Sequence, residues 1–441
     1  MKDLPQRGDT LHLDRTGEPV TVGERVGEGA QGVVHKVAQR SGRPLALKWY
    51  RRATDTPAQR SAIRELTARP NPHEAFLFPM DTVTTTEIGG FGYVMAWMDR
   101  RFSSFAQVIN DPQPLGLQTK ARIGRKLAEA FGALHASGLC YRDINFGNLW
   151  VDPLRGDVAI IDNDNVGIDD GHAAVWGVLR FMAPEVVRRE QRPSTVTDLH
   201  SLAVLLFYLL MHGHPLDGQR VEARLTWDEH RRSEEEQALA HYGEAPLFVF
   251  DPSDASNRPV PDHGPSRWWP LYPSFVHRPF VQAFTVGLRD ATLAGRVLAT
   301  TWRDTFVRMS DLCSVCPHCT AAVITDPDEP GRHCWHCDRP QPPLPMLRLR
   351  SGRSTVLLVA GAMISNHHLG VDRSYDTMAA HVEPHPGRPG NLVLRNRSTA
   401  TWTAQPHGGD ALAVEPGQAF AVRPATIDFG AVRGEIVLPS S

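Results

Sequence analysis

The 441-residue sequence has little lysine and no long apolar run. Only 5 of its 47 basic residues are lysines, and its formal net charge is −2. This balance argues against a nucleic-acid binder held by bulk positive charge. The longest apolar stretch, 202–211, is too short to cross a bilayer, and the first residues lack the apolar core of a secretory signal. We therefore expect a cytoplasmic protein with no membrane segment and no nucleic-acid partner.

Cysteine is also scarce, and five of the six cysteines fall between residues 313 and 337. Two C-x-x-C pairs are separated by 14 residues, a spacing that closes a tetrahedral site of four thiolates. We predict a structural Zn²⁺ in a zinc ribbon, because four protein ligands leave no open position for hydrolysis. Cys313 offers another register, and His333 or His336 could replace a thiolate. The predicted ligands are Cys316, Cys319, Cys334 and Cys337.

Apolar residues make up 41% of the chain and charged residues 22%, as in ordinary folded domains. Alternation over 20–50 and 75–98 predicts strands, and 57–68 between them predicts a short helix. Further helices are predicted over 121–137, 197–212, 280–289 and 297–308. After the cysteines, a proline-rich linker leads to short β-type runs that predict a small sandwich. These runs are 355–359, 391–394, 419–422 and 435–438.

Several motifs have the residue types that phosphate transfer requires. Residues 27–34 read G-E-G-A-Q-G-V-V, a loop whose glycines let the backbone approach phosphates. Lys48 follows about 20 residues later, at the place of a phosphate-binding lysine. Asp143 and Asn148, five residues apart, place a base and a metal ligand on one loop. Asp162 ends an apolar strand, where its carboxylate would bind Mg²⁺.

With M-A-P-E at 182–185, these motifs resemble those of the eukaryotic-like protein kinases over residues 20–308. The resemblance implies that Asp143 orients the acceptor hydroxyl and that Asn148 and Asp162 hold Mg²⁺. It also implies that Lys48, paired with a helix glutamate, positions the phosphates of ATP. Glu65 is the expected partner of Lys48, and Glu74 is the alternative.

The resemblance also implies a nucleotide pocket and a buried ion pair. Val34 and Ala46 would roof the adenine, Trp150 would floor it, and Met95 would be the gatekeeper. The hinge would be 96–98, and Arg296 would pair with Glu185. The nucleotide-binding residues so implied are Gly27, Glu28, Gly29, Ala30, Gln31, Gly32, Val34, Ala46, Lys48, Met95, Ala96, Met98 and Trp150.

The sequence departs from the kinase pattern at several positions. Tyr141 replaces a histidine in a packing role, and Asn145 replaces a lysine that clamps the γ-phosphate. D-N-D at 162–164 replaces Asp-Phe-Gly, and Val178 replaces a threonine in the substrate-docking loop. All five chemical positions are nevertheless filled, so an active protein kinase is the leading hypothesis. A nucleotide-binding pseudokinase scaffold and a kinase for a non-protein acceptor are the alternatives.

The segment from Asp162 to Glu185 contains no Ser, Thr or Tyr, so it offers no hydroxyl for phosphorylation. Many kinases are activated when a phosphate on this segment pairs with an arginine beside the catalytic aspartate, here Arg142. We therefore predict a loop ordered without modification, in which aspartates supply the charge. The candidate aspartates are Asp164, Asp169 and Asp170.

More narrowly, the chain resembles bacterial kinases of the tellurite-resistance-associated triads. The residues that carry this are 141–148, 162–165, 181–185, 198–215, 247–252 and 256–261, followed by the cysteine module. The resemblance implies two partners besides a protein substrate: a metal-dependent protein phosphatase and a von Willebrand A-domain protein.

The C-terminal β-rich segment is similar to forkhead-associated domains in G-R-S at 352–354, S-N-H-H at 365–368 and L-R-N-R-S at 394–398. In that family the Arg and Ser, here Arg353 and Ser365, hold a phosphothreonine through charge-assisted hydrogen bonds. The alternative is a β-sandwich that docks on the kinase.

The predicted fold is therefore α+β: a bilobal kinase-like fold, then a zinc ribbon and an all-β sandwich. Its cofactors would be ATP, Mg²⁺ and structural Zn²⁺. The predicted boundaries are 1–97 for the N-lobe, 98–308 for the C-lobe with an irregular insertion at about 218–275, 309–340 for the ribbon, 341–346 for the linker and 347–441 for the sandwich.

Overall fold

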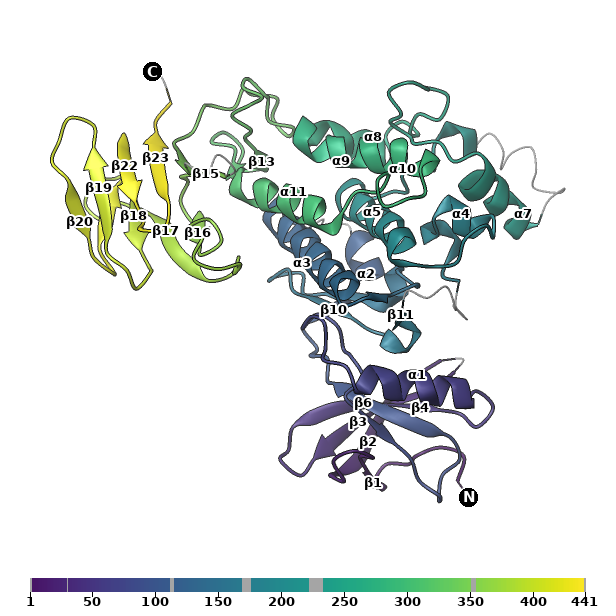
Figure 1. Ribbon diagram of the computed structural model, residues 1–441. Coiled ribbons are helices and arrows are strands. Elements are labelled where there is room, and N and C mark those ends of the chain that lie inside the picture. The colour runs from purple at the N-terminus through teal and green to yellow at the C-terminus, as the bar shows by residue number, and fades with distance from the viewer. Residues whose placement is uncertain are drawn as a thin grey trace. The chain divides into compact units, whose positions relative to one another are not determined.

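The computed structural model describes residues 2–29, 31–111, 115–168, 176–221, 233–349 and 354–439. The chain divides into two compact units (Figure 1). The first unit comprises 1–115, 122–269 and 277–303, and the second comprises 116–121, 270–276 and 304–441. The structure confirms a mixture of helix and sheet with a β-rich C-terminal part.

Six antiparallel strands form the N-terminal lobe, in the order β1-β2-β3-β4-β6-β5. Their core includes Val37, Leu47 and Trp49. Because side chains alternate along a strand, Ala46 and Lys48 lie together on the opposite face of β4. The strands are β1 (Thr10–His12), β2 (Pro19–Glu28), β3 (Gly32–Gln39), β4 (Pro44–Tyr50), β5 (Asp81–Val83) and β6 (Phe91–Ala96).

Helix α1 (Pro57–Thr67) interrupts the strands where the sequence predicts it. The Thr56 side chain accepts a hydrogen bond from the Gln59 backbone N–H, and Pro57 begins the helix with its fixed φ. Ile63 and Leu66, three residues apart, form its buried face.

Helices dominate the second lobe. The α-helices are α2 (Phe105–Ile109), α3 (Leu117–Ala136), α4 (Pro184–Val187), α5 (Thr195–Met211), α7 (Glu234–Ala238), α8 (Gly264–Trp268), α9 (Ser274–Phe284), α10 (Val286–Arg289) and α11 (Ala299–Asp311). Shorter helical turns are η1 (Phe146–Asn148), η2 (Asn163–Asn165), η3 (Leu179–Phe181), η4 (Leu239–Glu244) and η5 (Trp269–Leu271). The strands are β7 (Ser103–Ser104), β8 (Leu139–Cys140), β9 (Leu149–Val151), β10 (Val158–Ile160) and β11 (Gly167–Ile168).

The predicted helices at 121–137, 197–212 and 297–308 correspond to α3, α5 and α11. The single helix predicted over 280–289 is wrong: α9 ends at Phe284 and α10 begins at Val286, because Thr285 leaves helical geometry. Helix α5 is buried along most of its length, as predicted, and a capping box of Ser194 and Thr197 begins it. No described helix is both long and apolar enough to cross a membrane.

Glu185 at the start of α4 forms the buried ion pair with Arg296 that the kinase resemblance implies. The two side chains are 3% and 2% exposed. A pair this deeply buried is costly to break, because the remaining charge has no counter-ion and no water.

We expect Glu185→Gln to lower the free energy of unfolding by about 3–5 kcal/mol, measured by urea denaturation. Glu190→Gln is the control, since Glu190 pairs with Arg188 while 57% exposed and should hardly matter. Equal effects of the two variants would contradict the prediction.

The C-terminal strands form two sheets, in the orders β15-β14-β23-β22-β19-β20 and β16-β17-β18-β21. One core shared by both sheets includes Leu347, Leu394, Trp402 and Ile427. The four predicted runs match β15, β18, β21 and β23, whereas β14, β16, β17, β19, β20 and β22 were not predicted. The bounds are β14 (Met346–Leu349), β15 (Thr355–Leu357), β16 (Met363–Ser365), β17 (Met378–Pro384), β18 (Leu392–Asn396), β19 (Trp402–Pro406), β20 (Leu412–Val414), β21 (Ala419–Ala421), β22 (Ala425–Asp428) and β23 (Arg433–Val437).

Candidate active site and candidate metal centre

Two asparagines donate hydrogen bonds to the carboxylate of Asp143, one to each oxygen. Asn145 Nδ2 donates to Asp143 Oδ1 at 2.9 Å, and Asn148 Nδ2 donates to Asp143 Oδ2 at 3.1 Å. Both amides also donate to the backbone carbonyl of Asp143, at 3.0 Å each. Asn145 therefore orients the carboxylate, although it lacks the charge of the lysine that it replaces.

Asp198 on α5 holds the backbone of the loop that carries Asp143. Its carboxylate accepts the backbone N–H groups of Tyr141 at 2.6 Å and Arg142 at 2.9 Å. Arg142 has a φ of 73°, a left-handed conformation that non-glycine residues adopt only when the surroundings hold them there. No role for Asp198 was predicted; the signal in the sequence was a carboxylate in the first turn of a largely apolar, buried helix.

Tyr141 performs the packing role that its position predicts. It is buried against Phe76 and Phe131, and its hydroxyl donates to the carbonyl of Ile161. This hydrogen bond links the backbone before Asp162 to the loop that carries Asp143.

Lys48 on β4 does not pair with Glu65. Its ammonium contacts Asp162, and its Nζ donates to Asp164 Oδ2 at 2.7 Å. Glu65 is 52% exposed and pairs with Arg69 at 3.0 Å. The reason is helical geometry: Glu65 falls outside the α1 face formed by Ile63 and Leu66, and so points to solvent. The alternative partner, Glu74, is also exposed.

The electrostatics of this cluster follow from its burial. Burial lowers the pKa of Lys48, but the carboxylates of Asp164 and Asp162 outweigh this and raise that pKa above its ordinary value. Burial raises the pKa of Asp162, and the neighbouring charge of Asp164 raises it further. Burial also opposes ionisation of Asp164, but Lys48 outweighs it and lowers the pKa of Asp164.

The D-N-D segment forms the turn η2. Asp162 precedes it with a φ of 59°, in the left-handed region. Asn163, which replaces the usual phenylalanine, is fully buried, and its Nδ2 donates to the carbonyl of Ile160 at 2.9 Å. An internal hydrogen bond thus stabilises a position that kinases fill with an aromatic ring.

The glycine-rich loop lies between β2 and β3, where the Gly29 N–H donates to the Gly32 carbonyl at 2.9 Å. A Cβ on Gly32 would lie 2.0 Å from the carbonyl oxygen of Trp49, so the close approach of β3 to β4 requires glycine there. Gln31 accepts from Lys48 Nζ at 3.5 Å, and Glu28 contacts Arg51. Gly27 pairs with Val34 next to the last pair of the β2–β3 ladder, Glu28 with Val33, and Ala30 is outside the described residues.

The predicted adenine-binding residues lie on neighbouring strands. Val34 is paired with Lys48 across β3 and β4, and Ala46 is paired with Met95 across β4 and β6. Met95 is buried, Ala96 ends β6 and Met98 follows it. Trp150 lies in β9, and its buried indole N–H has no partner among the described residues.

The residues present fit ATP and Mg²⁺. Mg²⁺ prefers oxygen ligands, and Asp162 and Asn148 can each supply one. Two carboxylates surround the single ammonium of Lys48, an excess of negative charge that a divalent cation would balance.

Of the three aspartates predicted to supply charge to Arg142, Asp164 does not pair with it. The Arg142 guanidinium donates to the carbonyl of Ile168 at 2.8 Å, and Asp164 is engaged with Lys48 instead. The other two candidates, Asp169 and Asp170, are outside the described residues.

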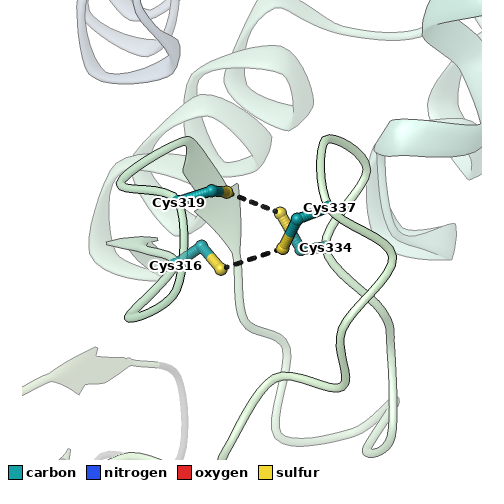
Figure 2. Close-up of side chains that lie close together, drawn as sticks. All are labelled: Cys316, Cys319, Cys334 and Cys337. Atoms are coloured by element: carbon teal, nitrogen blue, oxygen red, sulfur yellow. Dashed lines mark hydrogen bonds between the residues drawn. The ribbon is translucent and has the colours of Figure 1, made fainter.

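The four predicted metal-binding cysteines lie together, with all four sulfurs within 4.8 Å of one another (Figure 2). Cys316 Sγ is 3.7 Å from Cys337 Sγ, and Cys319 Sγ is 3.6 Å from Cys334 Sγ. A tetrahedral ion with Zn–S bonds of 2.3 Å requires sulfurs about 3.8 Å apart. The cluster therefore has the dimensions of a four-thiolate site.

Hydrogen bonding favours the thiolate form of Cys316, whereas at Cys319 a backbone hydrogen bond that lowers the pKa is outweighed by bonds with the neighbouring cysteines, which raise that pKa. Burial raises the pKa of Cys316, but the Gln341 side-chain amide and the backbone of His318 and Cys319 outweigh it and lower that pKa to about 5. Cys313 lies outside the cluster, in the hairpin of β12 (Cys313–Val315) and β13 (Ala322–Ile324), and burial raises its pKa to about 11. The alternative register through Cys313 is therefore wrong.

One of the two predicted phosphothreonine contacts, Ser365, is engaged in internal hydrogen bonds. Ser365 is 1% exposed, and its N–H and Oγ both bond to His368 Nδ1, at 2.9 and 3.0 Å. His368 Nε2 donates to both oxygens of Asp311 at the end of α11, at 3.1 Å each. Asn396, which lies in the L-R-N-R-S motif at the end of β18, is fully buried and donates to two backbone carbonyls. Arg353 is outside the described residues.

We expect His368→Ala to destabilise the second unit by about 1–3 kcal/mol, because it leaves Asp311 and Ser365 buried without their partner. Thermal denaturation measures this, and His407→Ala, at an exposed histidine of the same sandwich, is the control. Equal melting temperatures for the two variants would contradict the prediction.

A glycine-rich loop between two strands, a lysine in contact with an aspartate, and a second aspartate whose carboxylate is held by two asparagines are the features of a phosphotransfer site of the protein-kinase type. The family described as "Protein kinase domain" matches residues 20–245, just over half of the chain. The chain belongs to this family.

Two relatives are each called "Serine/threonine-protein kinase AfsK". The one from Streptomyces coelicolor is 26% identical over 215 residues, covering 47% of this chain. The one from Streptomyces griseus is 26% identical over 218 residues, also 47% of this chain. In each case the aligned region spans 26% of the relative, so the chain covers about a quarter of the length of these kinases.

Proposed function

We propose that the chain is an ATP-dependent serine/threonine protein kinase of a bacterial signalling or stress-response system. The observation that carries the proposal is Asp143, whose two carboxylate oxygens are fixed by Asn145 and Asn148 on a loop anchored by Asp198. An oriented carboxylate beside a metal-ligating amide is the arrangement that a hydroxyl acceptor requires.

Each residue then has a defined role. Asp143 orients the acceptor hydroxyl and accepts its proton while the hydroxyl oxygen bonds to the γ-phosphorus and ADP leaves. Lys48 would neutralise the α- and β-phosphates of ATP, and Asn148 and Asp162 would hold Mg²⁺, which would supply positive charge to the phosphates. Val34, Ala46, Met95 and Trp150 enclose the adenine.

A second candidate is a nucleotide-binding scaffold without catalysis. Two observations favour it. Asn145 stands where kinases have a lysine that binds the γ-phosphate, and the ammonium of Lys48 is held by two carboxylates. Incubation with Mg²⁺ and γ-labelled ATP, with and without the products of neighbouring genes, separates the two. Label transfer to serine or threonine supports the kinase, whereas ATP binding without turnover supports the scaffold.

We further propose that the cysteine cluster binds Zn²⁺ and forms a zinc ribbon, because its sulfur spacing suits that ion. The β-sandwich would dock through His368 and Asp311 rather than bind phosphothreonine, since Ser365 is engaged internally. The signalling partners of the whole chain would be a metal-dependent protein phosphatase and a von Willebrand A-domain protein.

A further inference from the structure

Lys48 has two carboxylate partners in very different environments. The side chain of Asp162 is 34% exposed, whereas that of Asp164 is 1% exposed. Asp164 Oδ2 accepts from Lys48 Nζ at 2.7 Å and also from the hydroxyl of Tyr50, two residues along β4 from the lysine. Two hydrogen bonds, from the Lys48 ammonium and the Tyr50 hydroxyl, therefore hold the Asp164 carboxylate in place.

Helix α1 supplies no carboxylate that could hold the ammonium of Lys48. Its single acidic residue, Glu65, points to solvent and pairs with Arg69. Burial raises the pKa of the Tyr50 hydroxyl and Gln59 of α1 opposes this shift, but the Gln59 side chain is neutral and supplies no anion. A phosphate-binding lysine needs a fixed anion to hold its ammonium in place. Of the two carboxylates that contact Lys48 among the described residues, that of Asp164 is the one buried from solvent.

We propose that Asp164 is the positioning residue that holds Lys48 for the phosphates of ATP, with Tyr50 holding Asp164 in turn. This inference rests on the proposed kinase function. Asp162 is then available to the metal ion without leaving Lys48 uncompensated. The anion for the lysine lies on the same turn as the metal ligand, so the position of Lys48 does not depend on movement of α1.

Asp164 could instead be a second metal ligand, since its Oδ1 is buried without a partner among the described residues. The two roles differ in one measurable way. A residue that acts through Lys48 affects nucleotide binding even without metal, because the lysine contacts the phosphates directly. A metal ligand affects binding only when Mg²⁺ is present.

The test compares Asp164→Asn with Glu65→Gln in ATP binding by calorimetry, with EDTA and with Mg²⁺. We expect Asp164→Asn to weaken ATP binding about ten- to hundredfold in both conditions, the value of a charge-assisted bond. Glu65→Gln should bind as the wild type does. Normal affinity of Asp164→Asn in EDTA, or an equal loss in Glu65→Gln, would overturn the inference.

A double variant guards against a merely structural effect. Lys48→Met with Asp164→Asn should bind ATP no more weakly than Lys48→Met alone, because both changes remove one interaction. Additive losses would overturn the inference. Since binding is measured rather than turnover, an inactive wild-type protein would refute the proposed kinase function and leave this comparison decisive.

Discussion

Asp143→Asn is expected to lower phosphate transfer from ATP by about 10²–10⁴-fold, the usual contribution of a positioned general base. Asparagine has an oxygen for only one of the two side-chain hydrogen bonds that Asn145 and Asn148 donate. Both amides also donate to the backbone carbonyl of residue 143, which the substitution leaves in place, so the loop should keep its geometry. The variant should therefore bind ATP and melt as the wild type does, and only the proton acceptor should be missing. Transfer of label from γ-labelled ATP, under single-turnover conditions, measures the loss.

Asp99→Asn is the matched control, because Asp99 is an exposed aspartate of the same compact unit, 3.7 Å from Arg101. It should transfer label at the wild-type rate. Unchanged transfer by Asp143→Asn would show that another group accepts the proton. A wild-type protein that binds ATP but transfers no label would favour the scaffold.

The sequence motifs were sufficient to predict the kinase lobes, because each strand or helix carries a local pattern of its own. They did not predict which face of α1 would be buried. Glu65 has the right residue type on the right helix, but the apolar pair Ile63 and Leu66 sets the rotation of the helix and turns Glu65 outward. Helix existence is a local property, whereas orientation depends on packing.

Asp164 and Ser365 also show that a sequence motif does not predict which partner a side chain contacts in the fold. Asp164 was one of three aspartates predicted to supply charge to Arg142, because the segment 162–185 has no hydroxyl to phosphorylate, yet its carboxylate contacts Lys48 instead. Ser365 matches a phosphate-binding motif but is buried by His368 and the sandwich core. A motif gives residue types and spacing. It does not give exposure, which decides whether a side chain can reach a ligand.

The four cysteines are the opposite case, because their spacing alone predicted their convergence (Figure 2). We expect the purified protein to contain one equivalent of zinc. Structural zinc typically contributes an apparent free energy of about 10–16 kcal/mol to small sites. Cys316→Ser or Cys337→Ser should therefore lose the metal and unfold the ribbon. Metal analysis and limited proteolysis around 313–337 measure the two effects.

Cys313→Ser is the matched control, since Cys313 lies in the adjoining hairpin but outside the cluster. It should retain zinc and resist proteolysis like the wild type. ATP binding should survive in all three variants, because the nucleotide-binding residues belong to the other compact unit. Zinc retained in Cys316→Ser, or lost in Cys313→Ser, would mean that a different set of ligands holds the ion. Freshly purified wild-type protein without zinc would refute the metal site itself.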